Sequence, residues 1–312
     1  MEGIKLTESL EGDATERKCG FVALVGAPNA GKSTLLNSLV GSKVSIVTRK
    51  AQTTRAQIRG VVTEGDTQLV FVDTPGIFGA KRRLDRAMVT SAWAGASDAD
   101  AVALIVDSRK GLTPEVTALL KELEHIKKPK LLVLNKIDLE QKERLFELAE
   151  LVNGQGKFTE TFMISALKGA GVQDFLKWCQ ENSPAGPWHF PEDQLTDLTL
   201  ALTAAEVTRE KLFDRIHDEI PYSTTVETES FDVKKDGSYR IGQVIYVTRD
   251  MHRKIILGEG GQTVKAIGAA SRRELGEMFD TKVHLFLFVK VRPKWTDDPE
   301  RYREMGLELP KE

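Results

Sequence analysis

The chain has 312 residues, of which 41% are hydrophobic and 29% are charged, and its formal net charge is −2 at pH 7. This length and composition indicate a globular protein of two domains, and the balanced charge does not by itself indicate a nucleic-acid partner. The 2 cysteines are too few for a disulfide framework, and no apolar stretch reaches the ~18 residues of a membrane-spanning helix. We expect a protein of the reducing cytoplasm whose acidic, polar residues 1–16 form a disordered extension rather than a signal peptide.

Residues 26–33 read Gly-Ala-Pro-Asn-Ala-Gly-Lys-Ser, which fits the phosphate-binding loop pattern. An apolar run at 21–25 predicts a buried strand before this loop, and a helix is predicted to begin at Lys32. Free backbone N–H groups and the helix dipole at such a junction favour phosphate. We expect Lys32 to meet the β- and γ-phosphates and Ser33 to ligate Mg²⁺. The predicted nucleotide contacts here are Gly26, Ala27, Pro28, Asn29, Ala30, Gly31, Lys32, Ser33 and Thr34.

A predicted strand at 68–72 ends in Asp73-Thr74-Pro75-Gly76, where Asp73 is expected to hold Mg²⁺ through water. The backbone N–H of Gly76 is expected to sense the γ-phosphate. Upstream, Ala51-Gln52-Thr53-Thr54-Arg55 lies in a polar stretch, and we assign Thr54 as the hydroxyl that completes the Mg²⁺ shell when a triphosphate is bound. Loops of this kind order around the γ-phosphate and relax on hydrolysis. A plain solvated loop is the alternative for the threonine pair.

Two further tetrapeptides follow predicted strands and are expected to hold the base. Asn135-Lys136-Ile137-Asp138 comes after the apolar run 130–134, and Ser165-Ala166-Leu167-Lys168 comes after 160–164. A carboxylate at Asp138 can accept hydrogen bonds from guanine N1–H and its 2-amino group, neither of which adenine offers. The remaining predicted nucleotide contacts are Asp73, Thr74, Pro75, Gly76, Ile77, Asn135, Lys136, Asp138, Ser165, Ala166 and Leu167.

The first part of the chain, residues 17–183, alternates strands with helical stretches. A further central strand is predicted at 100–107, and a helix is predicted from about Pro114, which suits a first helical turn. The alternation predicts an α/β domain with a doubly wound, mostly parallel sheet whose ligand loops lie at the carboxyl ends of the strands. Three prolines between 183 and 191 end the regular structure, so 184–197 is predicted to be a linker.

The second part, residues 198–312, has a different rhythm and is predicted to form a smaller α+β domain. Lys234 to Ser238 contains Asp-Gly, a hairpin signal. The predicted elements are a helix at 198–220, strands at 222–233 and 239–248, helices at 251–257 and 262–279, and a strand at 283–291.

Residues 258–261 read Gly-Glu-Gly-Gly and join the last two predicted helices. Glycines at both ends would let a single-stranded backbone pass close to main-chain N–H groups at a helix N-terminus. Basic residues exceed acidic ones between 249 and 294, which favours phosphate, although Glu259 stands where a cation would be expected. A helix–helix turn without a ligand is the alternative. The predicted RNA contacts are Lys254, Ile256, Leu257, Gly258, Glu259, Gly260, Gly261, Lys265, Arg272 and Arg273.

Five elements in order resemble those of translation-factor-related GTPases: 26–33, 51–55, 73–76, 135–138 and 165–167. The Gln-Thr-Thr-Arg and Asp-Thr-Pro-Gly forms of the second and third elements resemble Era-type GTPases. The element order of the second part, with its Gly-x-x-Gly, resembles a type II KH domain. It is similar to the C-terminal half of Era-type GTPases, including the ending Lys290-Val291-Arg292-Pro293-Lys294-Trp295.

The resemblance implies a GTPase that binds GTP and GDP with Mg²⁺ and uses Lys32, Thr54 and Gly76 in catalysis. It also implies that the protein binds 16S rRNA near its 3′ end and acts in assembly of the small (30S) ribosomal subunit. A monomer in the cytoplasm, with peripheral association at the cytoplasmic face of the inner membrane, is implied as well. GTP would order residues around 48–56 and 74–86 and so favour one placement of the KH domain.

The position after Gly76 has a mechanistic implication. GTPases of the Ras kind carry a glutamine there to orient the attacking water, whereas this chain has Ile77. In related enzymes an asparagine of the phosphate loop helps to bind K⁺, which then acts like an arginine finger. Asn29 occupies the matching place, so K⁺ is a second expected cofactor. A simple turn residue is the alternative for Asn29.

Three other functions fit parts of the sequence. The first is a GTP-dependent switch that acts on a protein or membrane partner through the C-terminal module. The second is a tRNA-modifying GTPase, but this needs a separate catalytic domain, for which 184–312 leaves little room. The third is a metabolic kinase, for which guanine-selective motifs are unnecessary and no acceptor site is evident.

Overall fold

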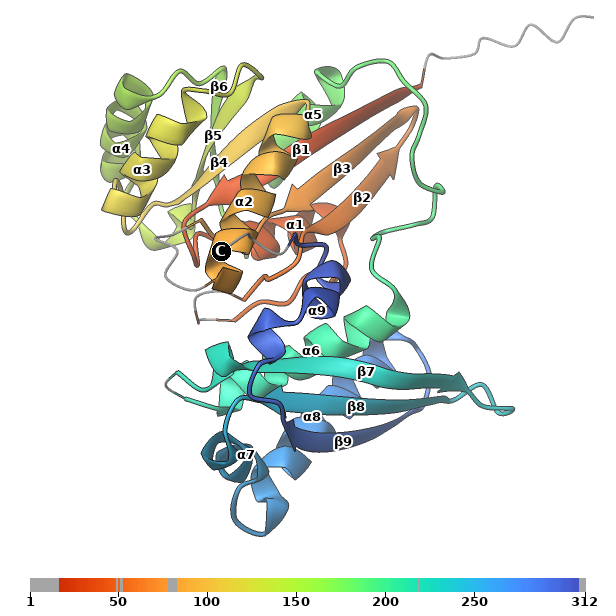
Figure 1. Cartoon of the computed structure of the whole chain (residues 1–312). Helices are drawn as coiled ribbons and strands as arrows, with labels where there is room; N and C mark the ends of the chain where they lie inside the picture. The colour runs from red at the N-terminus through yellow and green to blue at the C-terminus, as the bar shows by residue number, and fades with distance from the viewer. Residues whose placement is uncertain (1–16, 49, 51–52, 78–82, 218, 309–312) are drawn as a thin grey trace, which may run out of the picture.

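A computed structural model describes residues 17–308 except for 49, 51–52, 78–82 and 218. The predicted extension 1–16 lies outside the described residues, as do Ala51 and Gln52 of the second motif. Two sheets, each with its own helices, follow one another along the chain (Figure 1).

The first sheet has six strands in the order β2-β3-β1-β4-β5-β6. Every pair of neighbours is parallel except β2 with β3, which is antiparallel, so the predicted doubly wound and mostly parallel α/β sheet is confirmed. The elements are β1 Lys18–Gly26, α1 Lys32–Val40, β2 Ile58–Glu64, β3 Thr67–Asp73, α2 Arg83–Asp98, β4 Ala101–Asp107, α3 Pro114–Leu123, β5 Lys130–Asn135, η1 Ile137–Leu139, α4 Lys142–Gln155, β6 Glu160–Ile164 and α5 Val172–Glu181.

Both faces of this sheet are buried, because helices pack against each of them. Successive side chains of a strand point to opposite faces, so each strand contributes to both cores. In β1, Val22 and Leu24 belong to a core with α1 and α5, whereas Ala23 and Val25 belong to a second core with α2, α3 and α4. This explains why the strands read as continuous apolar runs. The carboxyl ends of β1, β3, β4 and β5 meet at one edge of the sheet, which positions the site described below.

The predicted linker lies along the first sheet. Thr196 forms an antiparallel bridge with Gly60 of β2. The buried side chain of Gln68 donates to the carbonyl of Phe190 at 2.9 Å and accepts from that residue's N–H at 3.0 Å. The segment 184–197 is therefore hydrogen-bonded to the edge of the first sheet before the chain enters the second unit.

The second sheet has the order β7-β8-β9, with β7 antiparallel to β8 and β8 parallel to β9. The predicted α+β order is confirmed, but the first helix is shorter than predicted because Ile216 is extended and Pro221 follows. The elements are α6 Leu200–Arg215, η2 Pro221–Ser223, β7 Thr224–Val233, β8 Tyr239–Val247, α7 Asp250–Leu257, η3 Glu259–Gly261, α8 Gln262–Met278 and β9 Val283–Val291.

The chain after β9 returns to the first unit. It forms η4 Trp295–Asp297 and α9 Pro299–Glu304, which lie beside the first sheet's domain in Figure 1. Trp295, Tyr302 and Leu307 form a buried cluster with Leu84 and Met88 of α2. The sequence pattern assigns this segment to the second domain alone, and the structure shows that it packs against both.

Candidate functional site

The phosphate-binding loop connects β1 to α1 as the sequence predicts. Gly31 has φ 103°, and a Cβ there would stand 2.2 Å from Nδ2 of Asn135, so both backbone conformation and space require glycine. The Lys32 side chain is buried, and its Nζ donates to the carbonyls of Gly26 at 3.1 Å and Ala27 at 3.3 Å. Burial lowers the pKa of Lys32 to about 8 despite the opposing charge of Asp73. An incoming phosphate would replace the two carbonyl partners with a stronger one.

Asp73 collects the hydroxyl groups expected around a metal ion. Its Oδ2 accepts hydrogen bonds from Ser33 at 2.6 Å, Ser45 at 3.0 Å and Thr54 at 3.3 Å. The other carboxylate oxygen is buried and has no hydrogen-bond partner among the described residues. Burial raises the pKa of Asp73, while Lys32 and the three hydroxyls oppose this. A buried carboxylate with a spare oxygen and two adjacent hydroxyls is a set of hard ligands that fits Mg²⁺.

This donor set also fits the way Mg²⁺ is usually held. Across the described residues, no group of three or more His, Cys, Asp and Glu side chains could hold a metal. Mg²⁺ normally takes one or two protein carboxylates and completes its shell with water and substrate phosphates. Thr54 lies 3.0 Å from the Ser33 hydroxyl, whereas the Thr53 hydroxyl bonds to Thr48 at 2.7 Å. The structure thus places Thr54, rather than Thr53, beside Ser33.

The residues after Asp73 are fixed by the backbone of the phosphate loop. Thr74 donates from its hydroxyl to the carbonyl of Leu24 at 2.8 Å, and the N–H of Ile77 donates to the carbonyl of Gly26 at 3.2 Å. The Ile77 side chain is buried in the core shared with α2, α3 and α4. A hydrocarbon side chain has no hydrogen-bonding atom, so it cannot orient a water molecule.

Asn135 connects three of the predicted motifs. Its Nδ2 donates to the carbonyl of Ala30 at 2.9 Å, and its Oδ1 accepts from the N–H of Ala166 at 3.0 Å. The neighbouring Lys136 donates from Nζ to the carbonyl of Asn29 and to Asp107 Oδ2, both at 2.6 Å. Asn135 is buried and therefore acts by holding the phosphate loop and the base motifs in register.

Asp138, the carboxylate predicted to bind guanine, follows the same strand in η1. Asp138 Oδ1 accepts a hydrogen bond from the Ser165 hydroxyl at 2.6 Å, and Oδ2 lies 3.5 Å from Nζ of Lys168. The Ser165 hydrogen bond is the main reason why the pKa of Asp138 is lowered. The adjacent Leu167 side chain is 79% exposed and makes no core contact, which leaves it free to cover a bound base.

A cavity of about 560 Å³ opens above the phosphate loop. It is lined by the predicted residues Pro28, Asn29, Gly31, Lys32, Ser33, Thr34, Thr54, Gly76 and Lys136. The sequence reasoning missed its other lining residues, which are Ile46, Val47, Thr48, Thr53, Asp107, Arg109 and Lys110. Asp107 could have been identified from the sequence, since it ends a predicted central strand. The other predicted nucleotide contacts do not line the cavity: Gly26, Ala27, Ala30, Asp73, Thr74, Pro75, Ile77, Asn135, Asp138, Ser165, Ala166 and Leu167.

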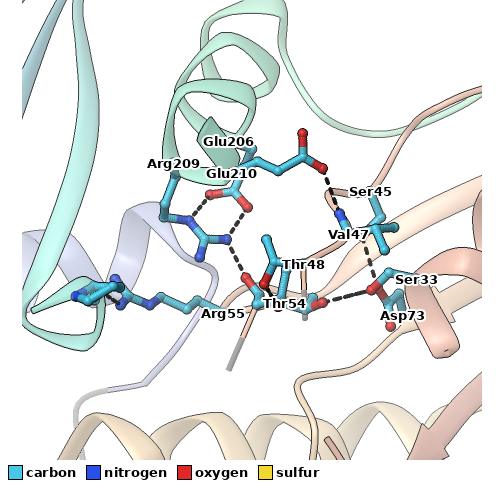
Figure 2. A network of polar contacts seen from close by, with 12 residues as sticks. Ser33, Ser45, Val47, Thr48, Thr54, Arg55, Asp73, Glu206, Arg209 and Glu210 are labelled. Atoms are coloured by element: carbon cyan, nitrogen blue, oxygen red, sulfur yellow. Dashed lines mark hydrogen bonds and ion pairs between the residues drawn. The ribbon is translucent and has the colours of Figure 1, made fainter. Parts of the chain in front are cut away.

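Buried polar contacts join this site to the second unit. Figure 2 shows α6 above the loop that carries Val47 and Thr54. Glu210 accepts from the N–H of Val47 at 2.8 Å, and Arg209 donates to the carbonyl of Thr53. Both α6 side chains are buried, so they add directional contacts in a low-dielectric setting. The segment between α1 and β2 therefore contacts Ser33 and Asp73 on one side and α6 on the other.

Arg55 makes a second buried connection. Its guanidinium donates to the carbonyl of Thr224, the first residue of β7, at 2.6 Å, and to the carbonyl of Pro221, which precedes β7, at 3.1 Å. The same group lies 5.8 Å from the ring centres of both Phe213 and Trp295. The arginine of the second motif is thus enclosed by the second unit rather than directed at the cavity.

The Gly-x-x-Gly loop has the backbone that its sequence requires. Gly258, Gly260 and Gly261 have φ values of 72°, 57° and 79°, which residues with a Cβ rarely adopt. Glu259, Lys254, Lys265, Arg272 and Arg273 are exposed. The prediction that the Ile256 side chain contacts RNA is corrected, because this side chain is fully buried in the core of α6, β7 and β8. Its neighbour Ile255 is 39% exposed instead.

The fold and the site define the class of this protein: a P-loop GTPase domain followed by a KH domain. A family model described as a 50S ribosome-binding GTPase matches residues 21–136, and a KH domain model matches 219–296. The curated relatives include GTPase Era of Afipia carboxidovorans, 58% identical over 302 residues covering 97% of this chain and 98% of the relative. GTPase Era of Brucella melitensis is 57% identical over 300 residues, with 96% of each chain covered.

Two solved structures agree with these relatives. A crystal structure of Era in complex with MgGDPNP and nucleotides 1506–1542 of 16S ribosomal RNA has a TM-score of 0.88, 37% identity, and coverage of 93% of this chain and 99% of that one. A point variant of Aquifex aeolicus Era bound to GDP·AlF4⁻ has a TM-score of 0.86 with the same identity and coverage. The chain belongs to the Era family of GTPases.

Proposed function

We propose that this protein is a GTP-hydrolysing switch that binds 16S rRNA near its 3′ end through its KH domain and acts in assembly of the small ribosomal subunit. The relative bound to MgGDPNP and to that part of 16S rRNA supports both ligands, because it matches nearly the whole chain. The observation that carries the switch is the buried contact of α6 with residues 47 and 53, which lie beside the metal-binding hydroxyls.

The catalytic site works mainly by positioning and by electrostatics. Lys32 would bind the β- and γ-phosphates, the Gly76 N–H would donate to the γ-phosphate, and Ser33, Thr54 and Asp73 would hold the metal ion, Asp73 through water. When bound, Mg²⁺ neutralises charge that develops on the phosphate oxygens. Ile77 has no polar side-chain atom, so it cannot orient the attacking water molecule.

K⁺ is the second cofactor that we propose, with Asn29 among its ligands. Asn29 has φ 64°, and its carbonyl is held by Lys136, so the side chain belongs to a fixed part of the loop. A monovalent cation there would compensate for the missing glutamine at position 77. Hydrolysis rates measured in K⁺ and in Na⁺ buffers at equal ionic strength test this. Faster turnover in K⁺, lost in Asn29→Ala, is expected, and equal rates in both salts would refute it.

GTP binding and RNA binding are coupled through the segment 45–55. Thr54 lies beside Ser33, and Glu210 and Arg209 of α6 bind the N–H of Val47 and the carbonyl of Thr53. A bound γ-phosphate with its metal ion would stabilise this arrangement of the segment. The KH domain is thereby favoured in one placement. Any ligand that prefers this placement, such as RNA, must in turn raise the affinity for GTP.

Binding of a short strand that matches the 3′ end of 16S rRNA tests the function directly. Fluorescence anisotropy would compare the protein with GDP and with a non-hydrolysable GTP analogue. Gly261→Asp adds a negative charge to the loop, and Gly237→Asp is its control, since that glycine also has positive φ and open space but lies in the β7–β8 hairpin.

Tight binding that depends on the analogue and is lost only in Gly261→Asp is expected. Equal affinity with GDP and the analogue would refute the coupling. No RNA binding in any nucleotide state would refute the RNA function and favour a protein or membrane partner. Three features stay predictions: the domain boundaries at residues 183 and 198, the monomeric state, and a cytoplasmic location with peripheral membrane association. No described helix is long and apolar enough to cross a membrane.

A further inference from the structure

One face of the KH sheet carries exposed aromatic side chains. Along β9, Leu285 and Leu287 pack among the helices in the domain core. Because side chains alternate along a strand, Phe286 and Phe288 point to the opposite face, where they are 48% and 58% exposed. In Figure 1, α6 and α8 lie on the other side of this sheet. Two adjacent exposed phenylalanines on a strand indicate a contact surface rather than a core.

The surroundings of these rings are basic. A hollow of about 450 Å³ at the start of β9 is lined by Phe286 and by three side chains that can carry positive charge, Arg272, Lys282 and His284, with no carboxylate in its lining. Arg240 of β8 lies over the Phe286 ring, 5.3 Å from its centre. A flat aromatic ring with an arginine above it and cations beside it suits bases and phosphates together.

The carboxylates on this face lie on β7, on the far side of β8. Asp232 lies 3.9 Å from Arg240, and Glu229 binds Lys290 at 3.0 Å. These carboxylates are already paired with cations, so the free positive charge lies at the β9 edge. This charge distribution favours a polyanion as the binding partner over a protein surface that carries both acidic and basic residues.

The hollow is continuous with the predicted RNA contacts, because Arg272 belongs to both. Arg272 stands 11 residues after Gly261 on α8, about 16 Å along the helix axis at 1.5 Å per residue. β9 packs against α8 and runs in the reverse direction, so its edge leads from the loop to the hollow. The Gly-x-x-Gly loop of a KH domain holds about four nucleotides, so a longer strand would have to continue past it.

We propose that Phe286 and Phe288, with the hollow formed by Arg272, Lys282 and His284, form a second RNA-binding surface. Unpaired bases adjacent to the four held at the loop stack on the two rings, and their phosphates lie against the basic side chains. This inference rests on the proposed RNA function. Stacking of this kind tolerates any base, so the surface adds affinity and directs the path of the strand rather than selecting sequence.

The test compares two RNAs on the full-length protein loaded with a GTP analogue. One strand of about four nucleotides reaches the loop alone, and one of about 16 nucleotides reaches both surfaces. The variant Phe286→Ser/Phe288→Ser removes the rings at exposed positions. Val233→Ser is the matched control, since Val233 is 68% exposed on β7 of the same sheet. Urea unfolding of each variant reports whether the fold is kept.

The double serine variant is expected to bind the long RNA at least tenfold more weakly and the short RNA equally well, while Val233→Ser changes neither. Arg272→Gln and Lys282→Gln should each lower the salt dependence of long-RNA binding by about one phosphate contact. Unchanged long-RNA affinity in the double variant, with wild-type binding intact, would overturn this inference alone. If the wild type binds neither RNA, the proposed function fails and this inference fails with it. A defect seen only with intact ribosomal subunits would assign the rings to a protein partner and overturn the RNA surface.

Discussion

Replacing Arg209 with methionine tests the link between the nucleotide site and the KH domain. The Arg209 side chain is 3% exposed, donates to Glu206 and to the Thr53 carbonyl, and lies 5.4 Å from the centre of the Phe213 ring. Methionine keeps much of the packing against this ring but removes every donor. Glu206 is 25% exposed in its side chain and can regain water, whereas the Thr53 carbonyl loses its charged partner.

The size of the effect follows from the contact that is lost. A hydrogen bond to a charged group contributes about 1.5–3 kcal/mol, and about 2 kcal/mol corresponds to roughly 30-fold in affinity. The contact between Arg209 and the Thr53 carbonyl holds the residue next to Thr54. Its removal should therefore lower the affinity for those nucleotides whose binding needs Thr54 beside Ser33. We therefore expect Arg209→Met to weaken binding of a GTP analogue about 30-fold and binding of GDP by less than about threefold.

Stopped-flow or equilibrium binding with fluorescent GDP and a fluorescent GTP analogue measures this difference. Arg215→Met is the control, since Arg215 lies on the same helix and its guanidinium contacts only the exposed backbone of Lys211 among the described interactions. The analogue-dependent RNA affinity of Arg209→Met should fall in parallel, because the coupling is reciprocal. Equal losses for GDP and the analogue, or none for either, would show that the contact does not respond to the γ-phosphate.

Three further predictions concern other parts of the molecule. Asp138→Asn should lower GTP affinity at least about 100-fold and favour xanthosine triphosphate, whose 2-oxygen accepts where guanine donates, and competition binding with both nucleotides decides this. Burial raises the pKa of Glu274, but hydrogen bonds from Lys211 and Lys43 outweigh it and lower the pKa overall, so this carboxylate stabilises the fold above the ordinary glutamate range. Urea unfolding should find Glu274→Gln less stable than wild type at pH 6, with the gap closing as the pH falls below about 4, and a constant gap would contradict it. Burial raises the pKa of the Cys179 thiol, so this thiol should react with a disulfide reagent only after unfolding, and rapid reaction of the native protein would show a local opening of α5.

The nucleotide site shows how far local sequence reaches. The loop at 26–33 is short, its glycine and lysine positions are fixed by the shape of a phosphate, and the strand before it is read directly from an apolar run. Asp73, Asn135 and Ser165 each follow such a run, and parallel strands bring their carboxyl ends to one edge. The fold of the first domain could therefore be predicted, and so could the positions of these residues at one edge of its sheet.

The errors have a common physical cause. β2 is an antiparallel strand with polar residues, and its pairing with β3 is what identifies it. The helix at 200–215 ends where Ile216 turns into the core, which periodicity does not show. The sequence predicts a surface contact at Ile256, although the environment of this side chain is set by α6 and the KH sheet. In each case the partner lies outside the local sequence window.

The sequence alone was enough to predict a GTPase with an RNA-binding domain, because the phosphate loop, the Asn-Lys-x-Asp motif and the Gly-x-x-Gly loop are each built from a few adjacent residues. Only the tertiary structure decided which residues connect the two domains. Arg55, Arg209 and Glu210 are charged residues that a sequence places on the surface, yet all three are buried where the domains meet. Trp295 and Tyr302 find their partners on α2, far earlier in the chain. Burial of a charge or of an isolated aromatic depends on what the rest of the fold brings against it, and that information is not local.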